Sequence, residues 1–409
     1  MATHTFLTHY MRVSWVFPHF HPVLAGAAER FRRYAPHFGK RGLAVDVMTS
    51  RDPSTLPDFE LLEGGLPVRR FEVSSDPRTR DQKLYEQVAN QLAADSGGGI
   101  VQTIKTERNL LPALRRIRAS GHHLVQVCTM VEPGLEDIRG LARLKRRIST
   151  YLTLRPFSAV VTSSRVMADW HRQFGVPEHK MHIISNGVDT IRFRPAEDAS
   201  ERAKCREALG VSKADFVVLV AGHLIPRKRP HLVVEAWRAV TAAYPSAVLL
   251  LAGSAKRPTV RSVEEEQDIA SYQQSVFDSI NAQGANVRWL GERSDMEVLY
   301  RAADAFAFPT EQEGFGNVIL EAMASRLPVV CAEFRGFPKA EIGGVVAIVQ
   351  EDTVEAWAEA LLKLAHEPVL AEHLGMTGYA LVSRKFTLDL VISQFQQVYQ
   401  GVLKKPISQ

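Results

Sequence analysis

Two glutamates and a pair of glycines mark the segment of the sequence with the clearest potential for chemistry. Residues 309–330 read PTEQEGFGNVILEAMASRLPVV and follow an apolar run that predicts a buried strand. Glu313 and Glu321 are eight residues apart, so a helix running through both would place them on roughly one face. Gly314 and Gly316 leave backbone N–H groups uncovered where a helix begins, and the positive end of its dipole favours an anion. The segment predicts a cradle for a phosphate and a sugar, although a plain strand-to-helix turn remains the alternative.

Basic side chains follow a second predicted strand. The sequence VAGHLIPRKRPHLVVEAW places His223, Arg227 and Lys228 directly after the apolar run 216–222. Open α/β sheets bind ligands beyond the carboxyl ends of their strands, and cations at that edge can neutralise a diphosphate. A solvated run of charge in front of a helix is the alternative, and these residues alone leave it open.

The sequence lacks the usual motifs of cofactor and metal sites. It contains no GxGxxG turn for a dinucleotide and no GxxxxGK[ST] loop for a nucleoside triphosphate. It also contains no HExxH and no DxD pair of carboxylates. We therefore expect neither a cofactor nor a metal, and dehydrogenase and ATPase functions are disfavoured.

These segments belong to two series of alternating strands and helices. Apolar runs at Met11–Phe17 and Leu43–Ser50 read as strands, with a helix over Gly26–Lys40 between them. The first series continues with the predicted strands 124–129, 158–164 and 181–187. The second series comprises the predicted strands 216–222, 247–253, 287–291, 305–310 and 327–332. The fold class is therefore α/β, with two doubly wound, Rossmann-like domains.

The stretch 194–214 loses strand character and carries dense charge, so the domain boundary should lie there. We predict a first domain over residues 1–196, a second over 197–386 and a final helix over 387–409. The chain has 409 residues, more than one hydrophobic core usually supports.

Composition excludes several broad classes. No apolar run approaches the roughly 18 residues of a membrane span, so an integral membrane protein is excluded. The first twenty residues lack the features of a secretory signal, and three scattered cysteines make no disulfide framework. A cytoplasmic protein is the expectation.

The sequence does not determine the function of one basic stretch. Residues 101–172 hold thirteen Lys or Arg against five Asp or Glu. Within it, apolar residues recur at helical spacing among the basic ones, namely Leu135, Ile138, Leu141, Ile148 and Leu152. A solvated helix face is the favoured interpretation of the basic residues. The amphipathic pattern fits a helix packed on the core, and equally a weak peripheral contact with the inner face of an anionic membrane. Nucleic acid is not expected as a partner, because no binding motif accompanies the charge.

The sequence resembles the family 4 glycosyltransferases of the GT-B fold along almost its entire length. The resemblance is carried by GAAE at 26–29, SNGVDTIRFRP at 185–195, GHLIPRK at 222–228, WLGERSDMEVLYRAADAFAFPT at 289–310 and the E(x7)E element from Glu313 to Glu321. The resemblance implies that the first domain binds the acceptor and the second binds the nucleotide sugar. It also implies that the final helix crosses back to the first domain.

Residue roles also follow from the resemblance. Glu321 would bind the nucleotide ribose, Glu313 with the following amides would hold the donor sugar, and Lys228 would bind the diphosphate. The implied catalytic residues are Glu313, Lys228 and Arg227. The implied donor-binding residues are Gly26, His223, Lys228, Leu290, Gly314, Phe315, Gly316, Asn317 and Glu321.

The family pattern has Arg at the position of His223, and it commonly has a histidine where the strand 124–129 ends. Here Cys128, Thr129 and Met130 occupy that stretch. The resemblance implies transfer of a sugar from a nucleoside diphosphate sugar, most commonly a UDP-sugar, with retention of configuration and without metal. The acceptor would be a small molecule, a lipid-linked molecule or a glycan. The alternative is a pseudo-glycosyltransferase or donor-binding protein with altered chemistry. An epimerase or donor phosphohydrolase on the same architecture is a further rival.

Overall fold

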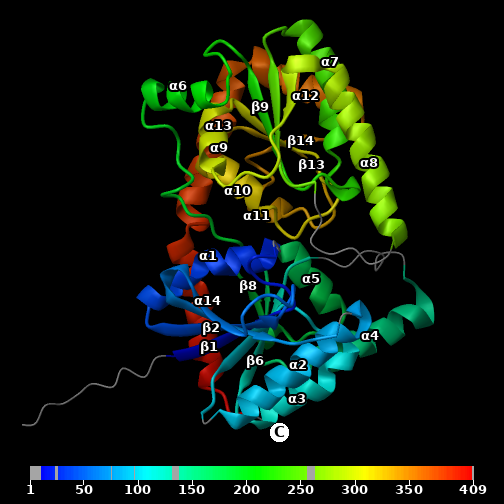
Figure 1. The fold of residues 1–409 in the computed structure, drawn as a ribbon, viewed down its shortest axis with the longest axis vertical. Coiled ribbons are helices and arrows are strands. Elements are labelled where there is room, and N and C mark those ends of the chain that lie inside the picture. The colour runs from blue at the N-terminus through cyan, green and yellow to red at the C-terminus, as the bar shows by residue number, and fades with distance from the viewer. Residues whose placement is uncertain are drawn as a thin grey trace, which may run out of the picture. The chain divides into compact units, whose positions relative to one another are not determined.

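The computed structural model describes residues 11–23, 26–74, 76–95, 97–130, 138–255 and 263–407. The chain divides into two compact units (Figure 1). Unit 1 contains the described residues up to Ser163, then Met167–Ile184 and the chain from Ile392 onward. Unit 2 contains Ser164–Val166 and Ser185–Val391.

A largely parallel sheet forms the middle of unit 1. Its eight strands lie in the order β3-β4-β2-β1-β5-β6-β7-β8, and β3 pairs antiparallel with β4 whereas the other pairs are parallel. The strands are β1 (Met11–Phe17), β2 (Leu43–Ser50), β3 (Phe59–Leu62), β4 (Leu66–Phe71), β5 (Ile100–Thr103), β6 (His123–Cys128), β7 (Ala159–Thr162) and β8 (Met181–Ile183). Because β2 and β5 flank β1 on opposite sides, the strand order turns back at β1. Such a switch point is where open α/β sheets bind ligands.

Helices cover both faces of this sheet. They are α1 (Gly26–Lys40), α2 (Pro77–Ala94), α3 (Leu111–Ala119), α4 (Gly140–Leu154), α5 (Arg165–Gln173) and α14 (Leu388–Leu403). On the α1 face, the Trp15 ring of β1 lies 5.0 Å from the Phe31 ring. Phe395 of α14 lies 5.6 Å from the same Phe31 ring. The final helix therefore packs its aromatic side on unit 1, which confirms the predicted return of the chain.

Unit 2 is a second doubly wound sheet, and all its strand pairs are parallel. Its six strands lie in the order β11-β10-β9-β12-β13-β14. The strands are β9 (Val217–Ala221), β10 (Val248–Ala252), β11 (Val287–Trp289), β12 (Ala305–Phe308), β13 (Val329–Ala332) and β14 (Ala347–Val349). The helices are α6 (Ala199–Ala208), α7 (Pro230–Ala243), α8 (Val263–Ala282), α9 (Met296–Ala302), α10 (Asn317–Ala324), α11 (Lys339–Ile342), α12 (Val354–His366) and α13 (Pro368–Lys385). The switch point of this sheet lies between β9 and β12.

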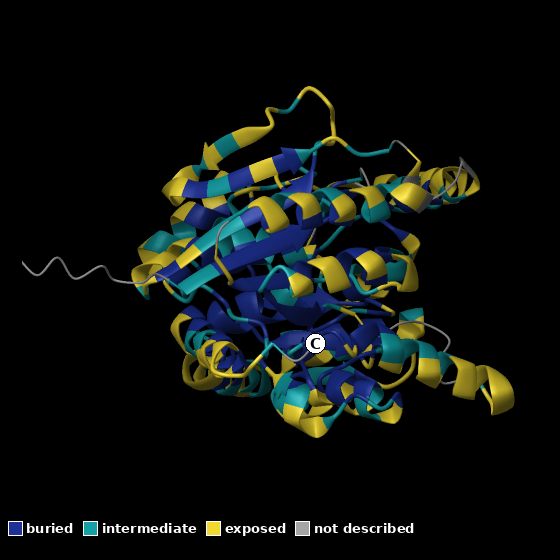
Figure 2. Ribbon diagram, turned by 90° about the horizontal axis from the view of Figure 1, so that it is seen from below, coloured by how far each residue is buried: buried dark blue, intermediate teal, exposed yellow. Residues whose placement is uncertain are grey.

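Burial explains why the central strands read as continuous apolar runs. Every residue of β9, β10, β12 and β13 is buried, because helices cover both faces of the sheet. Figure 2 shows the same division, with buried residues along the strands and exposed residues on the outer sides of the helices. The predicted α/β fold with two Rossmann-like sheets is confirmed.

The change from unit 1 to unit 2 falls earlier than the boundary predicted at residue 196. Unit 2 begins its long segment at Ser185, and the predicted linker contains α6. The Asp198 side chain caps this helix by accepting a hydrogen bond from the Glu201 amide at 2.8 Å. Arg206 of α6 is buried and lies 2.5 Å from Asp304, which anchors the helix to the second sheet. Dense charge in this stretch therefore reflects an ion-paired helix rather than a linker.

Candidate active site

Two loops that leave neighbouring strands bring basic and acidic residues together at the switch point of unit 2. Arg227 and Lys228 lie on the short helix η4 (Pro226–Lys228) that follows β9. Glu313 lies in the loop between β12 and α10. The Lys228 ammonium donates to Oε1 of Glu313, and an Arg227 guanidinium nitrogen lies 3.0 Å from the same oxygen. The structure thus joins the three predicted catalytic residues.

The electrostatics of this trio keep the Glu313 carboxyl ionised. Burial by itself would raise the pKa of the Glu313 carboxyl, but the charges of Lys228 and Arg227 outweigh burial and hold that pKa below its usual value. Lys228 also lies 5.0 Å from the centroid of the Phe308 ring, a cation–π contact. The Glu313 carboxylate therefore contacts both cations in this structure.

Two glycines let the strand ends approach closely beside this trio. Gly222 and Gly253 have φ values of 151° and 154°, a region that side chains rarely adopt. A Cβ at Gly253 would lie 1.9 Å from the carbonyl oxygen of Gly222. The Gly253 amide donates to the Gly291 carbonyl at 2.7 Å, which ties the end of β10 to the chain after β11. The backbones of Gly222 and Gly253 therefore pass each other closely beside the trio.

His223 stands where the family pattern has Arg, and it supplies no charge. Burial lowers its pKa, and the neighbouring Lys228 charge lowers it further, so the imidazole is neutral at pH 7. Its Nδ1 is buried without a hydrogen-bond partner among the described residues. Arg227, and not His223, is therefore the second cation beside Glu313.

Helix α10 begins at Asn317, immediately after the two glycines of the predicted cradle. Gly316 caps the helix with φ 81°, where a Cβ would crowd Ile319 and Phe308. The Asn186 side-chain amide donates to Oδ1 of Asn317 at 2.6 Å, so the start of α10 is fixed by the segment SNGVD. The first N–H groups of a helix have no partner within it, and they remain suited to an anion or hydroxyl.

The side chain of Phe315 belongs to the hydrophobic core, where its ring lies 5.6 Å from that of Phe386. If this residue contacts a donor, it does so through its backbone. Leu290, another predicted donor residue, uses its amide to donate to the Leu251 carbonyl at 2.8 Å, which leaves its carbonyl as the polar group nearest the strand end.

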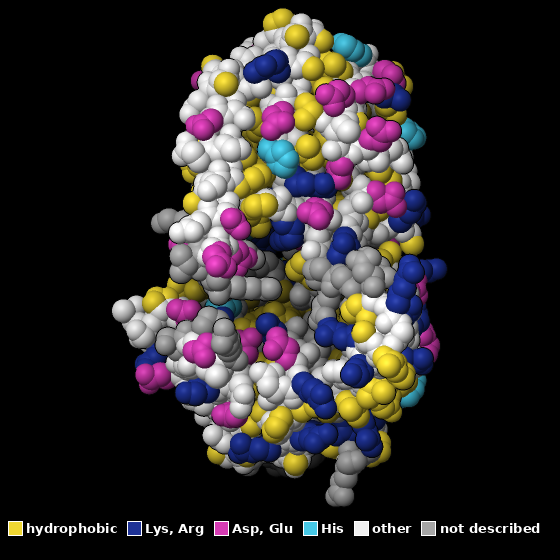
Figure 3. Space-filling model, turned by 90° about the vertical axis from the view of Figure 1, so that its right-hand side faces the viewer, with side chains coloured by type: hydrophobic (Ala, Val, Ile, Leu, Met, Phe, Trp, Pro, Cys, Tyr) yellow, Lys and Arg dark blue, Asp and Glu magenta, His cyan; other side chains and the backbone are white. Residues whose placement is uncertain are grey.

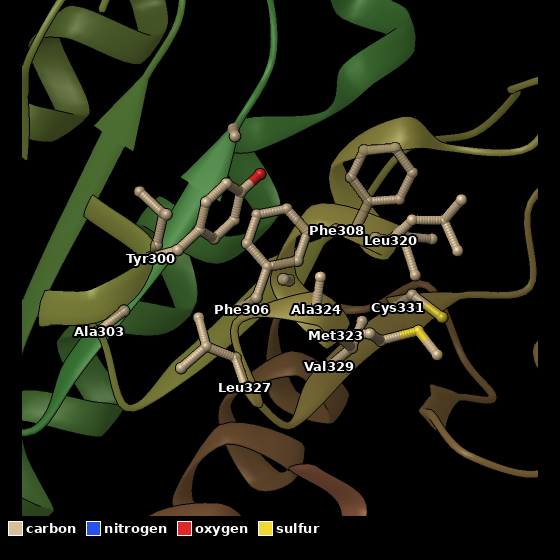
Figure 4. Close-up of a cluster of buried hydrophobic side chains, with 14 of the residues drawn as sticks. Tyr300, Ala303, Phe306, Phe308, Leu320, Met323, Ala324, Leu327, Val329 and Cys331 are labelled. Carbon is tan, nitrogen blue, oxygen red and sulfur yellow. The ribbon is translucent and has the colours of Figure 1, made fainter. Parts of the chain in front are cut away.

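Glu321 is a buried carboxylate in the middle of α10. It is 8% exposed, and Oε2 accepts a hydrogen bond from the Tyr300 hydroxyl at 3.0 Å. Figure 4 shows Tyr300 beside the apolar side chains of β12 and α10. The argument that Glu313 and Glu321 share a helical face was wrong, because α10 starts only after Glu313. The two carboxylates are placed by different elements.

Glu321→Gln tests the predicted ribose contact. The amide retains an oxygen that can accept from Tyr300, so the fold should persist, whereas a charged acceptor for ribose hydroxyls is lost. We expect every nucleotide to bind roughly tenfold more weakly, whatever its sugar, as measured by calorimetry. Glu311→Gln, an exposed change in the neighbouring loop, is the control. Unchanged nucleotide affinity in Glu321→Gln would remove Glu321 from the site.

Gly26 is the one predicted donor residue in unit 1. It is the first residue of α1, and a Cβ there would meet no atom within 4 Å. A substitution at this position therefore has room, and a glycine is not required by packing. Open space at a helix start is compatible with close approach of a ligand.

A histidine does lie at the end of β6, but it comes from another element. Nε2 of His171, on α5, is 3.0 Å from Sγ of Cys128, and its Nδ1 is 2.7 Å from the Met167 carbonyl. Nδ1 therefore carries the proton, and Nε2 accepts from the thiol. Burial lowers the pKa of His171 and raises that of Cys128 to about 12, so both groups are neutral. The Cys128–His171 contact therefore joins the end of β6 to α5.

Sequence reasoning missed a second polar cluster, at the switch point of unit 1. It comprises His19, Asp52, Arg80, Asp81 and Lys105, which follow β1, β2 and β5 or lie near the start of α2. The available signal was the position of His19 directly after the predicted first strand. Among the residues that the structure describes, no group of three or more His, Cys, Asp or Glu side chains is arranged to hold a metal ion.

The structure has two Rossmann-like units, and cations, glycines and a helix start lie at the switch-point edge of unit 2. This combination is typical of GT-B proteins. Comparison with known families agrees. The model described as "Glycosyl transferase 4-like domain" matches residues 25–187, and the model described as "Glycosyl transferases group 1" matches residues 201–380. The chain belongs to the family 4 glycosyltransferases of the GT-B fold.

Individual relatives are distant. The chain is 28% identical over 366 residues to a D-inositol 3-phosphate glycosyltransferase of Saccharomonospora viridis, covering 82% of this chain and 79% of the relative. It resembles the structure of Anabaena HepE in complex with UDP and glucose with a TM-score of 0.71 at 20% identity, covering 96% and 100% of the two chains. Sucrose-phosphate synthase from Thermosynechococcus elongatus gives a TM-score of 0.76 at 19% identity, covering 96% and 99%. These structural likenesses establish the shared fold.

Proposed function

We propose that this glycosyltransferase moves a hexosyl group from a nucleoside diphosphate sugar to an acceptor hydroxyl with retention of configuration. The observation that carries the proposal is the convergence of Lys228 and Arg227 on Glu313 between the ends of β9 and β12. Two cations at a switch point suit a diphosphate. UDP is the proposed nucleotide, as the family resemblance implies.

The mechanism follows from the charges at this edge. When the bond between the anomeric carbon and the diphosphate oxygen breaks, the diphosphate leaves with the electron pair and gains negative charge. The acceptor oxygen forms the new bond to the anomeric carbon, and its proton passes to the departing diphosphate. Lys228, Arg227 and the helix start at Asn317 are the groups that would stabilise it, and such preorganised stabilisation is usually the largest catalytic contribution. Glu313 would exchange its cations for the donor and hydrogen-bond the sugar hydroxyls.

The alternative of a donor-binding protein without transfer was motivated by the missing histidine of the first half. We do not retain it, since both family models that match the chain describe transferases.

A panel of nucleotides tests the proposal. UDP, GDP and ADP, each alone and as sugar conjugates, are added to the full chain while the melting temperature is recorded. A ligand at a hundred times its dissociation constant stabilises the folded state by roughly 2.7 kcal/mol. We expect UDP and its conjugates to raise the melting temperature. The absence of a shift with every nucleotide would contradict the function, and a shift with GDP or ADP alone would contradict the choice of UDP.

We also propose that transfer needs no metal. The donor diphosphate has two cationic side chains available at the site, so a divalent ion is not required to neutralise it. Donor consumption should therefore keep its rate in excess EDTA. Loss of activity in EDTA, with recovery on adding manganese or magnesium, would contradict this part of the proposal.

We propose a cytoplasmic location with peripheral contact between α4 and an anionic membrane. Cys128, Cys205 and Cys331 are free and buried, as suits a reducing compartment. No helix in the described part of the chain is long and apolar enough to pass through a bilayer. Contact would instead come from the surface of unit 1.

The exposed face of α4 supports this contact. Sequence alone left open whether its apolar stripe is buried. Of the predicted stripe, Leu141 is 77% and Ile148 50% exposed, whereas Ile138 and Leu152 are half-buried. Leu144 at 51% and Tyr151 at 45% add to the exposed apolar face of α4. Leu135, at the start of the predicted stripe, lies outside the described residues. Residues 138–168 contain seven Lys or Arg and no acidic residue. Figure 3, viewed from the side that carries α4 in Figure 1, shows Lys and Arg gathered with hydrophobic side chains in the lower part of the view. An apolar stripe among basic residues suits anionic lipid.

A charge-removal variant tests the membrane contact. Arg143, Lys145, Arg146 and Arg147 are replaced together by Ser, and sedimentation with vesicles is measured. The parent should sediment with anionic but not neutral vesicles, and salt should release it because exposed charges are screened within roughly 8 Å at physiological ionic strength. The variant should stay in solution and still consume donor with a soluble acceptor. Replacing the exposed Lys204, Lys213, Arg238 and Lys363 by Ser removes equal charge elsewhere and should leave sedimentation intact. No sedimentation of the parent at low salt would eliminate the contact.

A further inference from the structure

Polar side chains gather beyond the carboxyl ends of β1, β2 and β5, around the point where the strand order of unit 1 turns back. His19 follows β1, Asp52 follows β2 and Lys105 follows β5, while Arg80 and Asp81 lie near the start of α2. Open α/β sheets bind ligands at this edge. These residues take no part in the donor site described above, which belongs to unit 2.

Ion pairs connect these residues into one network. Asp52 Oδ2 lies 3.9 Å from Nδ1 of His19 and 3.8 Å from a terminal guanidinium nitrogen of Arg80. Lys105 Nζ lies 3.2 Å from Oδ2 of Asp81. The side chains of His19, Arg80 and Asp81 are mostly buried, whereas those of Asp52 and Lys105 reach solvent. The cluster therefore has a buried floor and an open rim.

The buried floor contains both donors and acceptors that lack partners. Nδ1 of His19, Nε of Arg80, Oδ1 of Asp81 and Oγ1 of Thr106 are buried and have no hydrogen-bond partner among the described residues. The Arg80 nitrogen and the Asp81 oxygen are 3.8 Å apart, too far to bond each other. Buried polar groups are rarely left unpaired, because the loss costs free energy.

The chemistry of these atoms identifies the kind of partner they suit. The Arg80 nitrogen can only donate a hydrogen bond, and the Asp81 carboxylate oxygen can only accept one. A hydroxyl group does both, so one hydroxyl placed beside the pair can accept from Arg80 and donate to Asp81. A phosphate oxygen without a proton can serve Arg80 but not Asp81. The cluster is therefore suited to a molecule rich in hydroxyl groups.

The net charge of the cluster also favours an uncharged ligand. Arg80 and Lys105 supply two positive charges against the two negative charges of Asp52 and Asp81. Glu107, which lies outside the cluster and 3.2 Å from Lys105, brings the net charge of this edge to −1. The donor site differs in this respect, because two cations there face the single carboxylate of Glu313, a net charge of +1. Anion sites in proteins instead carry an excess of Arg or Lys.

We propose that this edge of unit 1 binds the acceptor as an uncharged polyol or sugar that carries no phosphate at the contacted hydroxyls. Asp81 and Arg80 hold one hydroxyl between them, and His19 and Thr106 offer further hydrogen bonds. The inference rests on the proposed transfer function and names its acceptor class. It also separates this chain from its Saccharomonospora relative, whose name specifies inositol 3-phosphate.

The proposal is tested on the full chain with pairs of acceptors, each a neutral compound and its own phosphate monoester. The donor is the sugar nucleotide selected by the melting-temperature panel, and its consumption is measured with glucose, mannose and myo-inositol and with the phosphate monoester of each. We expect at least one neutral compound to accelerate donor consumption, and by about tenfold more than its own phosphate. A phosphate that is preferred to its parent, or no acceleration by any neutral compound, overturns the proposal. Failure of the donor function itself would appear separately, as the absence of nucleotide binding.

A variant that removes the negative charge of Asp81 distinguishes ligand contact from structural support. Asp81→Asn should raise KM for the neutral acceptor about tenfold, leave nucleotide binding unchanged and reduce the preference for the neutral member of each pair. A merely structural role would weaken use of both members equally, which counts against the proposal. Glu86→Gln, an exposed change on the same helix α2, is the control and should alter neither quantity.

Discussion

Lys228→Ala should weaken binding of a nucleoside diphosphate by roughly 10- to 100-fold, the range expected for loss of a charge-assisted hydrogen bond. The nucleoside without its phosphates should bind with nearly unchanged affinity. The reason is positional: Lys228 lies at the switch point with its ammonium on Glu313 and its charge over Phe308. Calorimetry with UDP and with uridine measures both affinities.

Two further variants sharpen this experiment. Lys213→Ala removes an exposed lysine of the same unit and should change neither affinity. Glu313→Gln removes the carboxylate that occupies Lys228 and Arg227 in this structure, so diphosphate binding should stay equal or strengthen while turnover falls. Equal losses for UDP and uridine in Lys228→Ala would show that the lysine supports the fold of the loop rather than the diphosphate.

Gly253→Ala should destabilise unit 2 by about 3 kcal/mol or more, because the new side chain strains the backbone and also clashes with a neighbouring carbonyl. The φ of 154° disfavours any side chain, and the new Cβ would lie 1.9 Å from the Gly222 carbonyl oxygen. Relief requires the ends of β9 and β10 to separate, which also displaces the loop that carries Lys228. Urea unfolding followed by tryptophan fluorescence measures the loss.

Gly344→Ala is the matched control for this substitution. Gly344 is an exposed glycine of the same unit, and a Cβ there would meet no atom within 4 Å. Its replacement should change the free energy of unfolding by less than about 1 kcal/mol. Similar unfolding curves for the two variants would contradict the close approach of the strands at Gly253.

Local pattern was sufficient to predict much of the fold. The strands Met11–Phe17 and Leu43–Ser50 and the helix Gly26–Lys40 have in the structure the bounds that the sequence indicates. Buried parallel strands leave apolar runs, and the short length of these runs between turn residues favours strands over helices. The strand β4, which lies between β3 and β2 in the sheet, was missed because its sequence LPVRRF looks like a polar loop. Its Arg70 is nevertheless buried, with Glu60 as its partner, a pairing that requires β3 alongside.

The sequence by itself determined which residue types the donor site contains, since glycines, cations and glutamates recur at positions that follow predicted strands. Tertiary structure decided how they meet. Glu313 pairs with Lys228, 85 residues away, because β9 and β12 are neighbours in the sheet although β10 and β11 lie between them in the chain. The same reversal at β1 assembles His19, Arg80, Asp81 and Lys105 from segments with no shared motif. Exposure of the α4 stripe was likewise undecided by spacing, because an amphipathic pattern fixes which residues share a face but not whether another element covers that face.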